Sequence, residues 1–99
     1  MDQSTVLSLA KAYADAVRSV MKTAGVFLYG SQARGTATRD SDIDIAVVVD
    51  RLPDDYLETL SLLWKLTRSV SQEIEPVLLS GEDDESGFLR TVQTTGIAV

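Results

Sequence analysis

The sequence contains no cysteine and no histidine, although it has 15 Asp and Glu residues. Disulfide bonds, thiolate metal sites and imidazole catalysis are excluded, because each of them requires one of the two missing side chains. Any acid–base or metal chemistry must therefore use carboxylates, whose oxygen atoms suit hard cations such as Mg²⁺.

Basic residues are also few, since 9 Lys and Arg against 15 Asp and Glu give a formal net charge of −6. A protein that binds nucleic acid directly usually presents a basic surface, which neutralises phosphates and releases counterions. We therefore expect no direct nucleic-acid binding. A small nucleotide that binds together with Mg²⁺ is still compatible with this charge, because the cation cancels part of the repulsion.

Long apolar runs are missing as well. The longest runs fall far short of the roughly 20 residues that a membrane span requires. The first residues lack the basic-then-apolar order of a signal peptide. We expect a cytoplasmic protein without membrane contact. Its 99 residues are enough for one domain, so residues 1–99 are predicted to form a single domain.

Hydrophobic spacing predicts helices that alternate with strands. Helices are expected over residues 4–23, 31–34, 53–70 and about 82–93, and strands over residues 26–29, 43–49, 74–79 and 97–99. Pro76 lacks a backbone N–H and so favours an edge position for its strand. This order predicts a small α/β (α+β) domain, with a mixed sheet flanked by helices.

The helix after Pro53 carries an apolar stripe. Its members are Leu57, Leu60, Leu63, Trp64 and Val70. Spacings of three and four residues place them on one face, which predicts that they contribute to the core. A groove for a helix of a partner protein is the alternative interpretation of the same stripe.

Gly30 and Ser31 follow the apolar segment 26–29, and ten residues separate them from Asp42. Glycine allows a close approach of the backbone to a ligand, and the start of a helix offers free N–H groups to phosphate. Asp42 and Asp44 lie two positions apart at the start of a strand, so their carboxylates point to the same side. The pattern predicts a metal-dependent site for a nucleoside triphosphate.

Other interpretations of these residues remain open. Asp42 and Asp44 could be solvated at a strand start, and Gly30 and Ser31 could serve only as a turn and a helix cap. Arg34 could bind an anionic group of the substrate, or it could pair with a neighbouring carboxylate for structural reasons.

Two segments carry a resemblance to a known family. GSQARG (residues 30–35) and SDIDI (residues 41–45) closely resemble the signature of the DNA polymerase β-like nucleotidyltransferase superfamily. The short chain resembles its minimal nucleotidyltransferases, the MNT proteins, over residues 5–98. The resemblance implies a nucleotidyltransferase fold, with Gly30 and Ser31 at the triphosphate and Asp42 and Asp44 as Mg²⁺ ligands.

Members of this family usually carry a third carboxylate on a later strand. Glu75, in the segment IEPV (residues 74–77), fits that place. The resemblance implies that it binds the catalytic metal and assists deprotonation of the attacking hydroxyl. The usual residue is Asp, and because Glu is one methylene longer, the resemblance predicts the fold more firmly than the activity.

The resemblance also implies a partner. Minimal nucleotidyltransferases often accompany a HEPN-domain toxin, to which they are thought to transfer AMP from ATP on a tyrosine hydroxyl, blocking its RNase activity. Two alternatives stay open: a non-catalytic antitoxin that covers the active site of the toxin, and transfer to a small molecule. A homodimer or a hetero-oligomer could supply the substrate-binding wall that such a small domain lacks.

Overall fold

The structure is a computed structural model that describes residues 2–38, 41–82, 84 and 86–99. Within these residues the chain forms one four-stranded sheet and four helices. The elements are α1 (Gln3–Val20), β1 (Gly25–Tyr29), α2 (Ser31–Arg34), β2 (Ile43–Val49), α3 (Tyr56–Thr67), β3 (Ile74–Ser80), α4 (Phe88–Thr95) and β4 (Ile97–Ala98). The predicted small α/β fold is confirmed.

The sheet is mixed, with the strand order β3-β2-β1-β4. β2 pairs antiparallel with β1 and parallel with β3, and β1 pairs antiparallel with β4. β3 forms an edge, as Pro76 predicted. β2 lies inside the sheet, and residues 45–49 are all buried, which explains their continuous apolar sequence.

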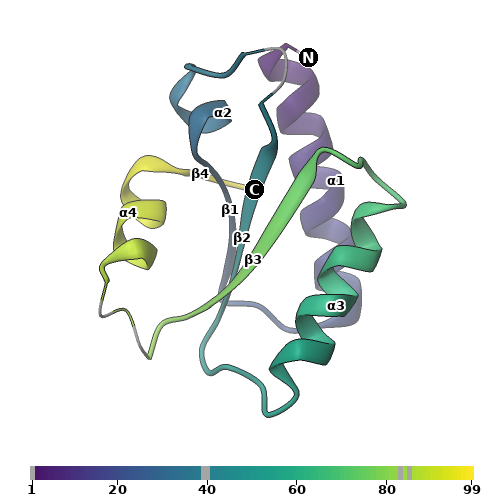
Figure 1. The fold of residues 1–99 in the computed structure, drawn as a ribbon, viewed down its shortest axis with the longest axis vertical. Coiled ribbons are helices and arrows are strands. Elements are labelled where there is room, and N and C mark those ends of the chain that lie inside the picture. Colours follow the sequence, from purple (N-terminus) through teal and green to yellow (C-terminus); the bar gives the residue numbers. More distant parts are fainter. Residues whose placement is uncertain (1, 39–40, 83, 85) are drawn as a thin grey trace.

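The helices cover the two faces of the sheet unequally. Figure 1 shows α1 and α3 together on one face, whereas α4 lies on the other face. Alternate residues of the strands point to α1 and α3 and form the main core with them. These core positions of the strands are Val26, Leu28, Ile43, Ile45, Val47, Val49, Ile74 and Leu78.

α1 follows the expected pattern of one buried stripe. Its buried residues are Val6, Ala10, Tyr13, Ala14 and Val17. The helix begins after Asp2, whose side chain accepts a hydrogen bond from the Thr5 N–H at 2.7 Å. It ends at Val20 rather than at residue 23, because the backbone is extended at Met21. Among the described residues, no helix is both long and apolar enough to cross a membrane.

The apolar stripe of α3 departs from the prediction. Leu63 is fully buried, and Leu60 packs half-buried against the core. Leu57 and Trp64, however, are 76% and 45% exposed. They lie two helical turns apart and therefore face outward together. The prediction that the whole stripe belongs to the core is wrong for these two residues.

α4 also begins later than predicted, at Phe88 instead of residue 82. The carboxylate of Asp84 accepts hydrogen bonds from the N–H groups of Leu89 (2.8 Å) and Arg90 (3.0 Å). The acidic segment thus supplies a cap for the helix rather than its first turn. Asp83 and Glu85, which belong to the same segment, lie outside the described residues.

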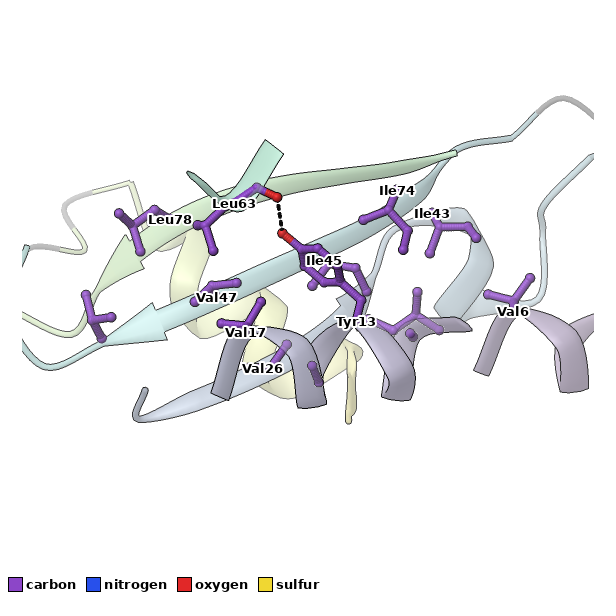
Figure 2. Packing of buried hydrophobic residues seen from close by; sticks show 14 residues of the cluster. Val6, Tyr13, Val17, Val26, Ile43, Ile45, Val47, Leu63, Ile74 and Leu78 are labelled. Atoms are coloured by element: carbon purple, nitrogen blue, oxygen red, sulfur yellow. Dashed lines mark hydrogen bonds between the residues drawn. The ribbon is translucent and has the colours of Figure 1, made fainter. Parts of the chain in front are cut away.

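One polar contact crosses the core between α1 and α3. The Tyr13 hydroxyl donates a hydrogen bond of 2.6 Å to the Leu63 carbonyl (Figure 2). Tyr13 is fully buried, and this burial raises the pKa of its hydroxyl well above the ordinary value. The hydroxyl therefore stays protonated and acts as the donor.

Replacing Tyr13 with Phe should destabilise the protein by about 0.5–1.5 kcal/mol, because a buried hydrogen bond is lost while the ring stays. For a domain of this size, that corresponds to a fall in Tm of several degrees. Tyr56→Phe is the matched control, since within the described residues the Tyr56 hydroxyl makes no hydrogen bond. Thermal unfolding with equal Tm values for both variants would contradict the prediction.

Candidate active site

Strand pairing places three side chains in a line across the sheet. Tyr29 of β1 pairs with Asp44 of β2, and Asp44 pairs with Glu75 of β3. Residues that pair directly across neighbouring strands point to the same face. We call Tyr29, Asp44 and Glu75 the cross-strand row. It lies on the face opposite α1 and α3, because the neighbouring residues Leu28, Ile45 and Ile74 point into the core.

Asp42 belongs to the same face. It is exposed and directly precedes β2, two positions before Asp44. The backbone at this point is fixed, because the Ile43 N–H donates a hydrogen bond of 2.8 Å to the Glu73 carbonyl. The structure therefore brings the three predicted carboxylates, Asp42, Asp44 and Glu75, to one face and one end of the sheet.

Gly30 packs directly against Asp44. Its backbone has φ +74° and ψ −154°, a region that is essentially restricted to glycine. A Cβ atom at position 30 would lie 2.5 Å from Oδ2 of Asp44, so the Asp44 carboxylate would have to move. Glycine therefore lets the turn before α2 contact the carboxylate.

A buried amide connects α2 to the loop that carries Asp42. Gln32 is 8% exposed, and its side-chain N–H donates to the Ser41 carbonyl at 3.2 Å. The Ser41 hydroxyl in turn accepts a hydrogen bond from the Thr38 N–H at 2.8 Å. Sequence reasoning missed these positioning contacts, because nothing in the motif indicates that a polar Gln is buried.

The carboxylates influence one another electrostatically. Burial, and then the charge of Asp42, raise the pKa of Asp44. The pKa of Glu75 is raised by desolvation, by the charges of Asp42 and Asp44, and by a side-chain hydrogen bond with Asp42. Negative charge is therefore concentrated here, and a bound cation would relieve the repulsion.

The donor set fits Mg²⁺. Asp42 and Asp44 offer the hard oxygen atoms that a divalent cation binds. A bound cation would also relieve the repulsion between them. Within the described residues, no group of three acidic side chains is close enough to hold a metal ion by itself. Mg²⁺ commonly uses one or two carboxylates and takes its other ligands from substrate phosphates and water. Asp42 and Asp44 would hold the ion in this arrangement.

Comparison with known proteins agrees with this geometry. The sequence profile of the nucleotidyltransferase domain family matches residues 10–80, which include the Gly-Ser turn, both aspartates and Glu75. The chain belongs to this nucleotidyltransferase family. A search of curated proteins finds no match.

Three solved structures share the nucleotidyltransferase fold. A Sulfolobus solfataricus protein described as a nucleotidyltransferase is 25% identical, with a TM-score of 0.69 over 97% of this chain and 80% of its own. A toxin–antitoxin structure with AMP-PNP is 23% identical, with a TM-score of 0.59 over 99% and 72%. The toxin–antitoxin MntA-HpeT, in a variant with two aspartates replaced by glutamate, is 21% identical, with a TM-score of 0.57 over 99% and 72%.

The remaining predicted residues of this nucleotidyltransferase site lie in α2. Ser31 is its half-buried first residue, next to Gly30, and Arg34 is its exposed last residue. Among the described residues Arg34 forms no ion pair. Both residues follow Gly30, which contacts Asp44, within four positions of the chain. Their roles toward a nucleotide remain predictions.

An aromatic pair borders the cross-strand row. The rings of Tyr29 and Phe88 meet edge-on, with centroids 5.5 Å apart and an interplanar angle of 81°. Burial, followed by the charges of Asp44 and Glu75, raises the pKa of Tyr29. Sequence reasoning missed this pair. The alternation of β1 could have placed Tyr29 beside Asp44, but no local signal connects Phe88 to it.

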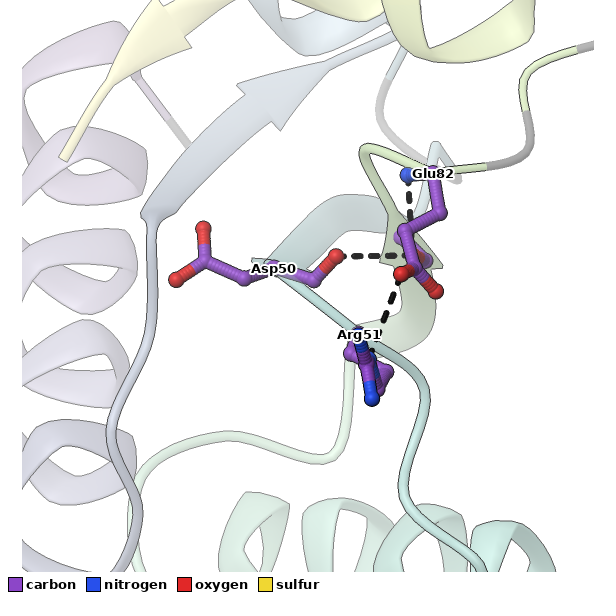
Figure 3. Close-up of polar contacts among 4 residues, drawn as sticks. Asp50, Arg51 and Glu82 are labelled. Carbon is purple, nitrogen blue, oxygen red and sulfur yellow. Dashed lines mark hydrogen bonds and ion pairs between the residues drawn. The ribbon is translucent and has the colours of Figure 1, made fainter.

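The opposite end of β2 has a different character. A cavity of about 460 Å³ opens there, lined by residues 20–24, 49–51, 53, 59 and 62. Nearby, Arg51 pairs with Glu82 at 3.2 Å, and the Ser80 hydroxyl donates to the Asp50 carbonyl at 3.2 Å (Figure 3). These contacts connect the ends of β2 and β3. Because the carboxylates lie at the start of β2 and the cavity lies at its end, the two are separate.

Replacing Gly30 with Ala should destabilise the domain more than replacing Gly35 with Ala. Both glycines have positive φ, and the left-handed conformation of Gly35 costs an alanine about 1–2 kcal/mol. At Gly35 a Cβ meets no atom within 4 Å, whereas at Gly30 it meets Asp44. Urea unfolding measures both costs.

A double-variant cycle with Asp44→Ala separates the contact from the backbone strain at Gly30. The cost of Gly30→Ala should fall when the Asp44 carboxylate is absent. An unchanged cost would show that the carboxylate does not limit space at position 30.

Proposed function

We propose that this chain is a Mg²⁺-dependent nucleotidyltransferase that transfers AMP from ATP to a tyrosine hydroxyl of a HEPN-domain toxin, and that it acts as the antitoxin. The observation that carries this proposal is the alignment of Asp44 with Glu75, next to Asp42 and in contact with Gly30. It brings three carboxylates and a glycine turn to one end of the sheet.

In the proposed reaction, the acceptor oxygen forms a bond to the α-phosphorus of ATP. The bond between this phosphorus and the bridging oxygen to the β-phosphate breaks, and pyrophosphate leaves. Asp42 and Asp44 hold the cation, which supplies positive charge to the reacting phosphate oxygens. Glu75, which pairs with Asp44 across the strands, accepts the proton of the hydroxyl.

The turn at α2 serves the triphosphate in this proposal. Gly30 allows the backbone to approach the phosphates, and Ser31 contributes its hydroxyl. The first N–H groups of a helical turn have no acceptor within that turn and are free to donate. Arg34 lies on the last turn of α2, where its charge can face an anionic group of the substrate.

The toxin–antitoxin neighbours support the proposed nucleotide and partner. One of them contains AMP-PNP, an ATP analogue. In the other, the two replaced aspartates are two positions apart, like Asp42 and Asp44 here. Their identities of 23% and 21% establish a common fold, so nucleotide, toxin partner and antitoxin role are proposals for this chain. The net charge of −6 fits binding to a basic partner but does not identify that partner.

The direct test is intact-mass spectrometry of a HEPN partner after incubation with this chain, ATP and Mg²⁺. The partner should gain the mass of AMP, and Asp42→Asn/Asp44→Asn should abolish the gain because the cation is no longer held. Asp54→Asn, an exposed change before α3, should leave transfer intact. Transfer by the double variant would contradict the assigned roles of both aspartates.

A second candidate function is neutralisation by binding alone. Glu75 in place of the usual Asp favours it. A purely steric antitoxin would neutralise the toxin equally well with Asp42→Asn/Asp44→Asn. Loss of neutralisation by a variant that still binds the toxin would support the chemical route.

The role of Glu75 can be tested by changing the length and the charge of its side chain. Glu75→Gln should lower the rate of AMP transfer by roughly 10²–10⁴-fold, because the proton acceptor is removed. Glu75→Asp should retain much of the activity, because the carboxylate stays at the same register position. Steady-state rates of pyrophosphate release measure both. A Glu75→Gln variant as active as the unaltered chain would assign Glu75 to the exposed sheet edge only.

A further inference from the structure

Phe88 has free ring surface beside the proposed site. It is 39% exposed, although α4 is anchored to the sheet by the buried residues Leu89 and Val92. Among the described residues, the aromatic contact of the Phe88 ring is with the half-buried Tyr29. Packing of α4 thus does not depend on burying Phe88, and the ring is available for a ligand.

The position of Phe88 is nevertheless well fixed. It is the first residue of α4, and its N–H donates to the Ser86 hydroxyl at 3.3 Å. The next two N–H groups of the helix donate to the carboxylate of Asp84. A ring that is held in place loses little conformational freedom when it binds a ligand.

The cross-strand row limits where a nucleoside could extend from the carboxylates. Gly30 packs against Asp44, and in the proposed function the triphosphate lies at the turn that Gly30 forms. On the β3 side of Asp44 the next side chain is the anionic Glu75, and on the β1 side it is Tyr29. A flat, uncharged base is better accommodated by aromatic rings than by a carboxylate.

We propose that the Phe88 ring stacks on the adenine base of ATP, and that the edge-on contact with Tyr29 holds the Phe88 ring in place. Stacking on an aromatic side chain is a common mode of base recognition, because every base has a π-face. This inference rests on the proposed function, since it requires the nucleotide to bind at Asp42 and Asp44.

The test compares two probes by isothermal titration calorimetry in the presence of Mg²⁺: ATP and inorganic tripolyphosphate. Phe88→Ala and Phe88→Leu should weaken ATP binding by about 5- to 150-fold, the effect of losing one base–aromatic stack. Neither variant should change the affinity for tripolyphosphate, which has no base. Phe88→Trp should restore ATP binding, because its ring is also a stacking surface.

Two controls make the result specific. Phe88→Leu keeps an apolar side chain against Tyr29, so it separates loss of the ring from loss of helix packing. Leu57→Ala, at an exposed position of α3 on the other side of the sheet, should leave both affinities unchanged.

Unchanged ATP affinity in Phe88→Leu and Phe88→Ala would overturn the stacking role while leaving the proposed function standing. Equal weakening of ATP and tripolyphosphate would also overturn it, since the effect would then not involve the base. If the unaltered chain bound neither probe, the proposed function would fail together with this inference.

Discussion

The site depends on the register between β1, β2 and β3. A shift of one residue in either pairing would turn one member of the cross-strand row into the core, because side chains alternate between the faces of a strand. The core itself prevents such a shift. Ile43, Ile45 and Val47 are buried under α1 and α3, and exchanging any of them for Asp44 would bury an unpaired carboxylate. Burial of one face of β2 therefore fixes the chemistry of the other.

The sequence was sufficient where the signal is local. The continuous run of β-branched residues located β2, the glycine turn located α2, and Pro76 indicated an edge strand. These local signals placed Asp42 and Asp44 on one side of β2, whereas only the family resemblance associated Glu75 with them. Long-range relations were not accessible. The exposure of Leu57 and Trp64 depends on how α3 packs against α1. The contact between Tyr29 and Phe88 depends on where the chain places α4 after β3.

Helix starts show the same limit at a smaller scale. The acidic segment from residue 82 was expected to begin the last helix, since acidic side chains suit a helix N-terminus. Asp84 does interact with that terminus, but from outside the helix, through the N–H groups of Leu89 and Arg90. The composition of the segment predicted that a negative charge would lie at the N-terminus of the helix. The geometry of the loop determines that Asp84 supplies this charge.

The edge strand bears on the proposed role of Glu75 as the third carboxylate. Pro76 follows Glu75, and a residue before proline is restricted to extended backbone conformations. The Glu75 backbone is therefore held in its strand, while its side chain is exposed at an edge that pairs only with β2. Because Glu75 is exposed at this edge, its extra methylene can be accommodated by side-chain rotation instead of backbone movement. A longer carboxylate thus needs no rearrangement of β2, where Asp44 and its contact with Gly30 leave little room.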